Sequence, residues 1–67
     1  MKLKKAKKIA KDRGAKYIAV DDTLNIFIHN TKPIIDRYNV DWTSENEIEY
    51  LGKYTGSKDW RNTLRKI

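Results

Sequence analysis

The chain has 67 residues, of which 39% are apolar and none is cysteine. This length has room for one small hydrophobic core, so we expect a single domain spanning residues 1–67. The lack of cysteine excludes disulfides, thiolate nucleophiles and zinc sites built on cysteine. No apolar run approaches the roughly 18 residues that span a bilayer. We therefore expect a soluble cytoplasmic protein that does not bind membranes.

Charge is unevenly distributed along the sequence. Eight of the 15 basic residues lie in the first sixteen positions, where there is a single acidic residue. Residues 17–57 hold three basic and seven acidic side chains, and residues 58–67 hold four basic and one acidic. Such segregation favours phosphate-rich or acidic partners, although it does not identify a reaction.

Residues 2–13 are predicted to form an amphipathic helix. Its apolar side chains recur at helical spacing on one face: Leu3, Ala6, Ile9 and Ala10. At 100° per residue, the opposite face carries four lysines: Lys4, Lys5, Lys8 and Lys11. Gly14 stands where a residue of left-handed conformation would end this helix.

A β-hairpin is expected next, from strands at 17–20 and 24–29. The first is a short apolar run, and the second alternates with Leu24, Ile26 and Ile28 on one face. Asp21, Asp22 and Thr23 provide turn residues between them. Pro33 ends the second strand because proline cannot donate a hydrogen bond to a sheet.

Residues 34–56 support two interpretations, and the stretch 34–42 fits neither a helical nor a strand period. Ser44 and Glu47 have the spacing of a helix capping box, which favours a helix through Leu51. Alternation of apolar and acidic residues, with two nearby glycines, favours a strand at about 47–54 instead. We choose the strand, because a third antiparallel strand would give a sheet of stable size.

The C-terminal segment is predicted to be a second helix. Ser57 is a good N-cap, and Asp59 would lie in the first turn. Three apolar residues follow the i, i+4, i+7 pattern of one helix face: Trp60, Leu64 and Ile67. Arg61 and Arg65 would lie away from that face. The expected fold is α+β, in the order α-β-β-β-α, with two helices on one face of a three-stranded antiparallel sheet.

The order of these features resembles short accessory proteins of tailed bacteriophages. The resemblance is strongest in the Tyr-Leu-Gly…Tyr-Thr-Gly…Trp…Leu pattern of residues 50–64, preceded by Lys32-Pro33 and an isolated Trp42. It implies a protein of the host bacterial cytoplasm that acts on host or defence machinery by binding an enzyme, a nucleic acid or a signalling nucleotide. It implies no catalytic residue.

Enzyme chemistry has little support in the sequence. His29 is the only histidine, and no nucleophile-elbow pattern surrounds Ser44 or Ser57. The acidic residues of 36–49 do not have the spacing of a calcium loop, and they could instead mimic nucleic acid or form a solvated surface. We expect no enzyme activity, metal or cofactor, and we expect His29 to end an edge strand in contact with solvent.

The basic helix is the clearest candidate for a functional surface. Its lysines could follow a phosphate backbone, and the residues we assign to ligand binding are Lys4, Lys5, Lys8, Lys11, Trp42, Arg61 and Arg65. Lysine favours attraction to the backbone over base reading. The leading hypothesis is a non-enzymatic protein that binds nucleic acid or a nucleotide. The alternatives are an inhibitor or modulator of a host bacterial enzyme, or lysines that only keep the surface soluble.

Trp42 supports three interpretations. It could stack on a base of the ligand, anchor a protein interface, or close an open edge of the sheet.

Overall fold

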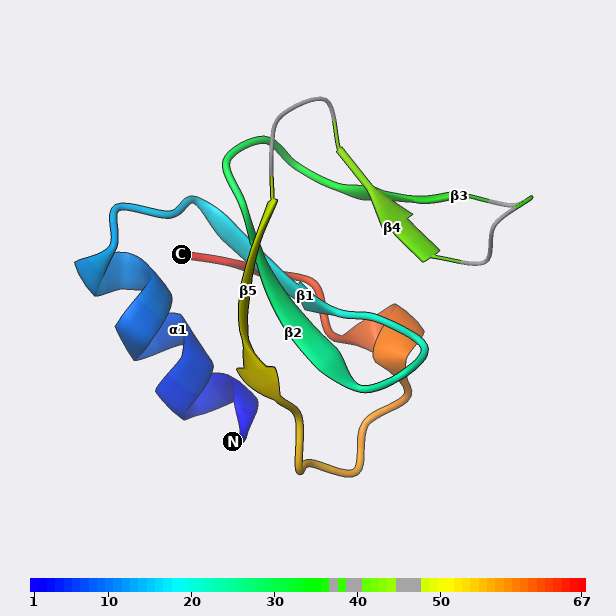
Figure 1. Ribbon diagram of the computed structural model, residues 1–67, viewed down its shortest axis with the longest axis horizontal. Coiled ribbons are helices and arrows are strands. Elements are labelled where there is room, and N and C mark those ends of the chain that lie inside the picture. The colour runs from blue at the N-terminus through cyan, green and yellow to red at the C-terminus, as the bar shows by residue number, and fades with distance from the viewer. Residues whose placement is uncertain (37, 39–40, 45–47) are drawn as a thin grey trace.

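A computed structural model describes residues 1–36, 38, 41–44 and 48–67 (Figure 1). These residues form one α-helix, a four-stranded sheet and a separate two-stranded sheet. The elements in chain order are α1 (Leu3–Asp12), β1 (Tyr17–Val20), β2 (Asn25–His29), β3 (Ile34–Asp36), β4 (Asp41–Thr43), β5 (Ile48–Lys53), the 3₁₀ turn η1 (Trp60–Asn62) and β6 (Arg65–Lys66). No helix in the described part of the chain is long and apolar enough to cross a membrane.

The N-terminal helix is confirmed. Helix α1 buries Leu3, Ala6 and Ala10, while Ile9 is partly buried at the edge of the same face. These side chains pack on one face of the main sheet, where the buried residues are Ile18, Val20, Ile26 and Ile28. Gly14 follows the helix with a φ of 75°, the left-handed conformation that the sequence predicts at this position.

The hairpin of β1 and β2 is also confirmed, with Ile18 opposite Ile28 and Val20 opposite Ile26. The carboxylate of Asp21 organises its turn by accepting hydrogen bonds from the backbone amides of Thr23 and Asn25, at 3.0 and 2.8 Å. Leu24 was expected within the second strand. It lies in the turn instead, exposed and with a φ of 65°, so β2 begins one residue later.

The expected third strand is confirmed as β5, which pairs antiparallel with β2. The competing interpretation was a helix that begins near Ser44 and continues through Leu51. Within that range, residues 45–47 lie outside the described residues, and residues 48–51 belong to β5. A β-bulge interrupts the pairing near Ile26 and Phe27. Tertiary pairing with β2 therefore prevails over the helical interpretation from residue 48 onwards.

The predicted C-terminal helix is wrong. Residues 60–62 form only the short turn η1, and β6 pairs antiparallel with β1, so the sheet order is β5-β2-β1-β6. The physical reason is the second edge of β1, whose amides and carbonyls need partners. A helix of about ten residues is only marginally stable by itself, so strand pairing wins. The apolar pattern still serves the core, because Trp60 and Ile67 pack against it.

The expected α-β-β-β-α fold with two helices on one sheet face is therefore wrong. Only α1 covers that face in the described residues, and most regular elements are strands. Residues 34–36 and 41–43, which fitted neither period, form the β3–β4 hairpin. His29 was expected to be solvated on an edge strand. It is 1% exposed and lies on β2, a central strand.

The β3–β4 hairpin is attached to the main sheet by side chains. The indole N–H of Trp42 donates to the carbonyl of Val20 at 2.9 Å, and its ring lies edge-on to Trp60 with centroids 6.4 Å apart. His29 Nδ1 lies 3.0 Å from Ser44 Oγ just beyond β4. Two short strands are marginal in isolation, so these contacts hold the hairpin in place.

Substitution of Thr63 tests how the C-terminal segment is attached to β1. Its buried hydroxyl accepts from the amide of Val20 at 2.9 Å and donates to the carbonyl of Trp60 at 2.6 Å. We expect Thr63→Val to lower the free energy of unfolding by about 1–3 kcal/mol, because the buried amide loses its partner. Urea denaturation measures this change. The exposed Thr43→Val is the matched control, expected to change stability by about 0.5 kcal/mol or less. Equal effects of the two substitutions would contradict this assignment.

Candidate functional site

The outer face of α1 carries a dense group of lysines. All five lysines within the helix are exposed: Lys4, Lys5, Lys7, Lys8 and Lys11. We call this group the lysine face. None of the five makes an ion pair or hydrogen bond with another side chain of the described residues. The four lysines singled out from the sequence are thus brought together, and Lys7 joins them.

Contacts at both ends of α1 fix the direction of the lysine face. At its start, the backbone of Met1 donates to the carbonyl of Lys53 and accepts from the amide of Thr55 at 2.9 Å. Just beyond its end, Arg13 forms an ion pair with Glu49 of β5 at 2.9 Å. The helix therefore lies beside β5 (Figure 1). Its apolar side chains pack on the sheet, and the lysine face is exposed to solvent.

The lysine face is electrostatically unfavourable for the helix itself. Lys4 and Lys8, like Lys7 and Lys11, stand four residues apart, and like charges at this spacing destabilise a helix by about 0.2–0.5 kcal/mol per pair. The first turn contains no acidic residue, and the N-cap residue Lys2 makes no side-chain cap. Cations at this end also oppose the helix dipole. A bound anion would relieve both kinds of repulsion.

A pocket of about 320 Å³ lies where α1 begins. Lys2 and Leu3 line one side, and the segment after β5 lines the other, from Tyr54 to Lys58. Two lysines and three hydroxyl-bearing side chains thus surround the positive end of the helix dipole. The sequence analysis missed this pocket, because the chain segments that form it are more than fifty residues apart.

Arg61 and Arg65 do not extend the lysine face. Arg61 forms an ion pair with Asp59 at 2.9 Å, and hydrogen bonding to the guanidinium lowers the pKa of Asp59 to about 2. Arg65 donates to the carbonyls of Asn62 and Leu64, both at 2.9 Å. Arg61 lies in η1, which Figure 1 shows apart from α1, and Arg65 is the first residue of β6. The surface of two helices expected from the sequence is absent from the described residues because the second helix does not form.

Trp42 is likewise separate from the lysine face. Its ring is only partly exposed, packs edge-on against Trp60 and is held by the hydrogen bond to Val20. Of the three roles considered from the sequence, this geometry favours the structural one, in which Trp42 closes the sheet beside β1.

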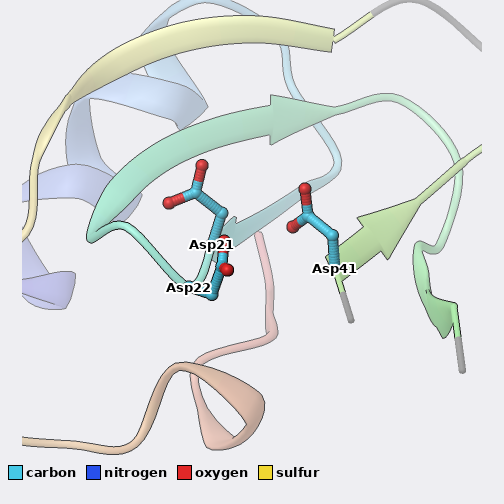
Figure 2. A group of neighbouring side chains, drawn as sticks. All are labelled: Asp21, Asp22 and Asp41. Carbon is cyan, nitrogen blue, oxygen red and sulfur yellow. The ribbon is translucent and has the colours of Figure 1, made fainter. Parts of the chain in front are cut away.

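A second group of charges has the opposite sign. Figure 2 shows Asp21 at the end of β1, Asp22 in the turn and Asp41 on β4, and one carboxylate oxygen from each lies within 4.8 Å of the others. Among the described residues this is the group that could bind a cation. The carboxylate of Asp21 already accepts hydrogen bonds from its own turn. Partial burial raises the pKa of Asp41, and repulsion by Asp21 and Asp22 adds to this effect.

His29 and Ser44 are the one pair of described side chains with the types needed for nucleophilic catalysis. Their contact of 3.0 Å uses Nδ1 of the imidazole. None of the described carboxylates is hydrogen-bonded to His29, although Asp21 and Asp41 line the same small pocket of about 110 Å³. We therefore interpret the pair as an attachment of the β3–β4 hairpin.

No protein-family model, curated protein or solved structure matches this chain.

The pH dependence of stability tests the environment of His29. Burial lowers its pKa below the ordinary 6.5, so the unfolded chain binds this proton more readily than the folded protein. The folded protein therefore has its full stability above pH 6.5, where His29 is neutral in both states. Part of that stability is lost as the pH falls from 6.5 through the lowered pKa. We expect the free energy of unfolding to decrease over this range, and His29→Gln should remove that decrease. NMR titration of the single imidazole measures the pKa directly. A value at or above 6.5 would contradict the buried placement.

Proposed function

We propose that the lysine face of α1 binds the phosphate groups of a phosphate-rich ligand, either nucleic acid or a signalling nucleotide. The observation that carries this proposal is the set of five exposed lysines without an ion-pair partner among the described residues. Each contact between a lysine and a phosphate releases condensed counterions, which makes binding favourable at low salt. In this proposal the protein acts by binding, without catalysis.

The resemblance of residues 50–64 to phage accessory proteins supports a biological setting for this activity. In that setting the protein is made in the cytoplasm of a bacterial host, where nucleic acids and nucleotide signals are abundant. The lysine face does not depend on this resemblance, since it follows from the position of α1 on the sheet.

A second candidate function is inhibition or modulation of a host enzyme through a protein interface. The observation that favours it is a set of exposed apolar side chains on the strands, including Ile34 at 66% exposure, Ile48 and Tyr50. Ile48 and Tyr50 are two residues apart on β5 and so share one of its faces, and neighbouring exposed apolar side chains are typical of interaction surfaces. Binding through apolar side chains would depend weakly on salt, whereas phosphate binding would weaken steeply with salt.

Neutralising part of the lysine face tests the leading proposal. In the triple variant Lys4→Gln, Lys8→Gln and Lys11→Gln, helix propensity changes little, so circular dichroism should show an intact fold. We expect affinity for inorganic polyphosphate, measured by titration calorimetry at several salt concentrations, to fall by roughly tenfold or more.

The matched control removes three exposed lysines that lie outside α1: Lys32→Gln, Lys53→Gln and Lys66→Gln. Both variants have the same net charge, so a general electrostatic effect would weaken both equally. We expect the control to retain most of its affinity. Equal losses in the two variants, or no binding of polyphosphate by the wild-type protein, would exclude the lysine face as the binding site.

A further inference from the structure

We infer that the ligand of the lysine face is the sugar–phosphate backbone of double-stranded nucleic acid, bound without sequence preference. This inference rests on the proposed function and narrows it from phosphate-rich ligands in general to one class. The shape of the lysine face, the location of aromatic side chains and the choice of lysine support it independently.

The lysine face is convex and extended. Its side chains project from the outside of a helix, and Lys4 and Lys11 are seven residues apart, or about 10.5 Å along the axis at 1.5 Å per residue. Lysines arranged in this way diverge, so they are poorly placed to surround one phosphate group. They suit a row of phosphates on an extended surface, whereas small ligands bind in concave sites.

The pocket at the start of α1 does not contain the lysine face. The pocket at the start of the helix is lined by Lys2 and Lys58, and none of the five lysines of the lysine face contributes to its lining. A nucleotide in that pocket would therefore leave the repulsion among those lysines largely unrelieved. A duplex that lies along α1 would relieve it.

Aromatic side chains are absent from α1, and the exposed rings lie elsewhere. Tyr50 is 52% exposed on β5, where it pairs with Phe27 and contacts that ring edge-on at 5.8 Å. Successive side chains of β2 point to opposite faces of the sheet, and Ile26 and Ile28 pack on the face that α1 covers. Phe27, which lies between them, therefore points to the other face, together with its partner Tyr50. Tyr38, which is 96% exposed, lies between β3 and β4 in the sequence, and Figure 1 shows both strands apart from α1.

Single strands gain about 1–3 kcal/mol for each base that stacks on an aromatic side chain. The lysine face offers no such contact, so it gives a single strand no compensation for its lower charge density. A duplex carries one charge per roughly 1.7 Å of its axis, the denser target for a row of lysines. Lysine also lacks the planar fork with which arginine recognises guanine, so we expect no sequence preference.

Competition binding distinguishes the ligand classes. A fluorescently labelled short DNA duplex is bound to the intact protein, and its anisotropy is followed as competitors are added. The competitors are unlabelled duplex DNA, duplex RNA of the same sequence, either single strand, a nucleoside triphosphate and polyglutamate. We expect a duplex to compete at roughly tenfold lower concentration than the single strand, and the triphosphate and polyglutamate to compete more weakly still. Comparison of DNA with RNA identifies which duplex is preferred, and either preference supports the inference.

Two variants connect the duplex to the lysine face. Lys4→Gln, Lys8→Gln and Lys11→Gln together should reduce the slope of log affinity against log salt by roughly three units, about one for each lost phosphate contact. Tyr50→Ala should leave duplex affinity unchanged, because its ring lies on the opposite face of the sheet.

Three results would overturn the inference: equal or tighter binding of the single strand, equal competition by the triphosphate or polyglutamate, or loss of duplex binding in Tyr50→Ala. Such a result can be told apart from failure of the proposed function. If polyphosphate binding still depends on Lys4, Lys8 and Lys11, the phosphate-binding surface stands and only the duplex assignment is wrong.

Discussion

The end of β1 is the point on which the rest of this structure depends. The amide of Val20 donates to the hydroxyl of Thr63, and its carbonyl accepts from the indole of Trp42. One residue thus joins the C-terminal segment and the β3–β4 hairpin to the main sheet. These contacts satisfy backbone groups that would otherwise be buried without partners, which is costly in a domain this small.

Other contacts determine how α1 is presented. Because the C-terminal segment continues along β1 as β6, α1 is the only helix among the described residues that covers the inner sheet face. Met1 and Arg13 attach its two ends to β5, which keeps Lys4, Lys8 and Lys11 directed to solvent. The exposure of the lysine face thus follows from the burial of the opposite side of α1 against the sheet.

Local patterns in the sequence predict the elements that local patterns control. The amphipathic spacing of residues 2–13, the turn at Asp21 and the alternation around Tyr50 identify α1, the β1–β2 hairpin and β5. The structure of the C-terminal segment depends instead on a tertiary contact, the pairing of β6 with the second edge of β1. The helical spacing of apolar residues from Trp60 to Ile67 carries no information about that pairing. The same limit applies to His29, whose burial on a central strand depends on β5 and the β3–β4 hairpin. For the candidate site, the lysines of one helix follow from periodicity. The separation of Arg61, Arg65 and Trp42 from them depends on tertiary contacts, as does the cluster of Asp21, Asp22 and Asp41.

The most direct test of the lysine face as the binding surface is chemical-shift mapping of the ¹⁵N-labelled protein during titration with a short DNA duplex. The account predicts that the perturbed amides belong to α1 and its flanking residues, with the largest changes around Lys4, Lys8 and Lys11. The signals of the ring protons of Tyr38 and Tyr50, followed in the same titration, should remain unchanged. Perturbations centred on Ile34, Ile48 and Tyr50, with α1 unaffected, would contradict the account and support a binding surface on the strands.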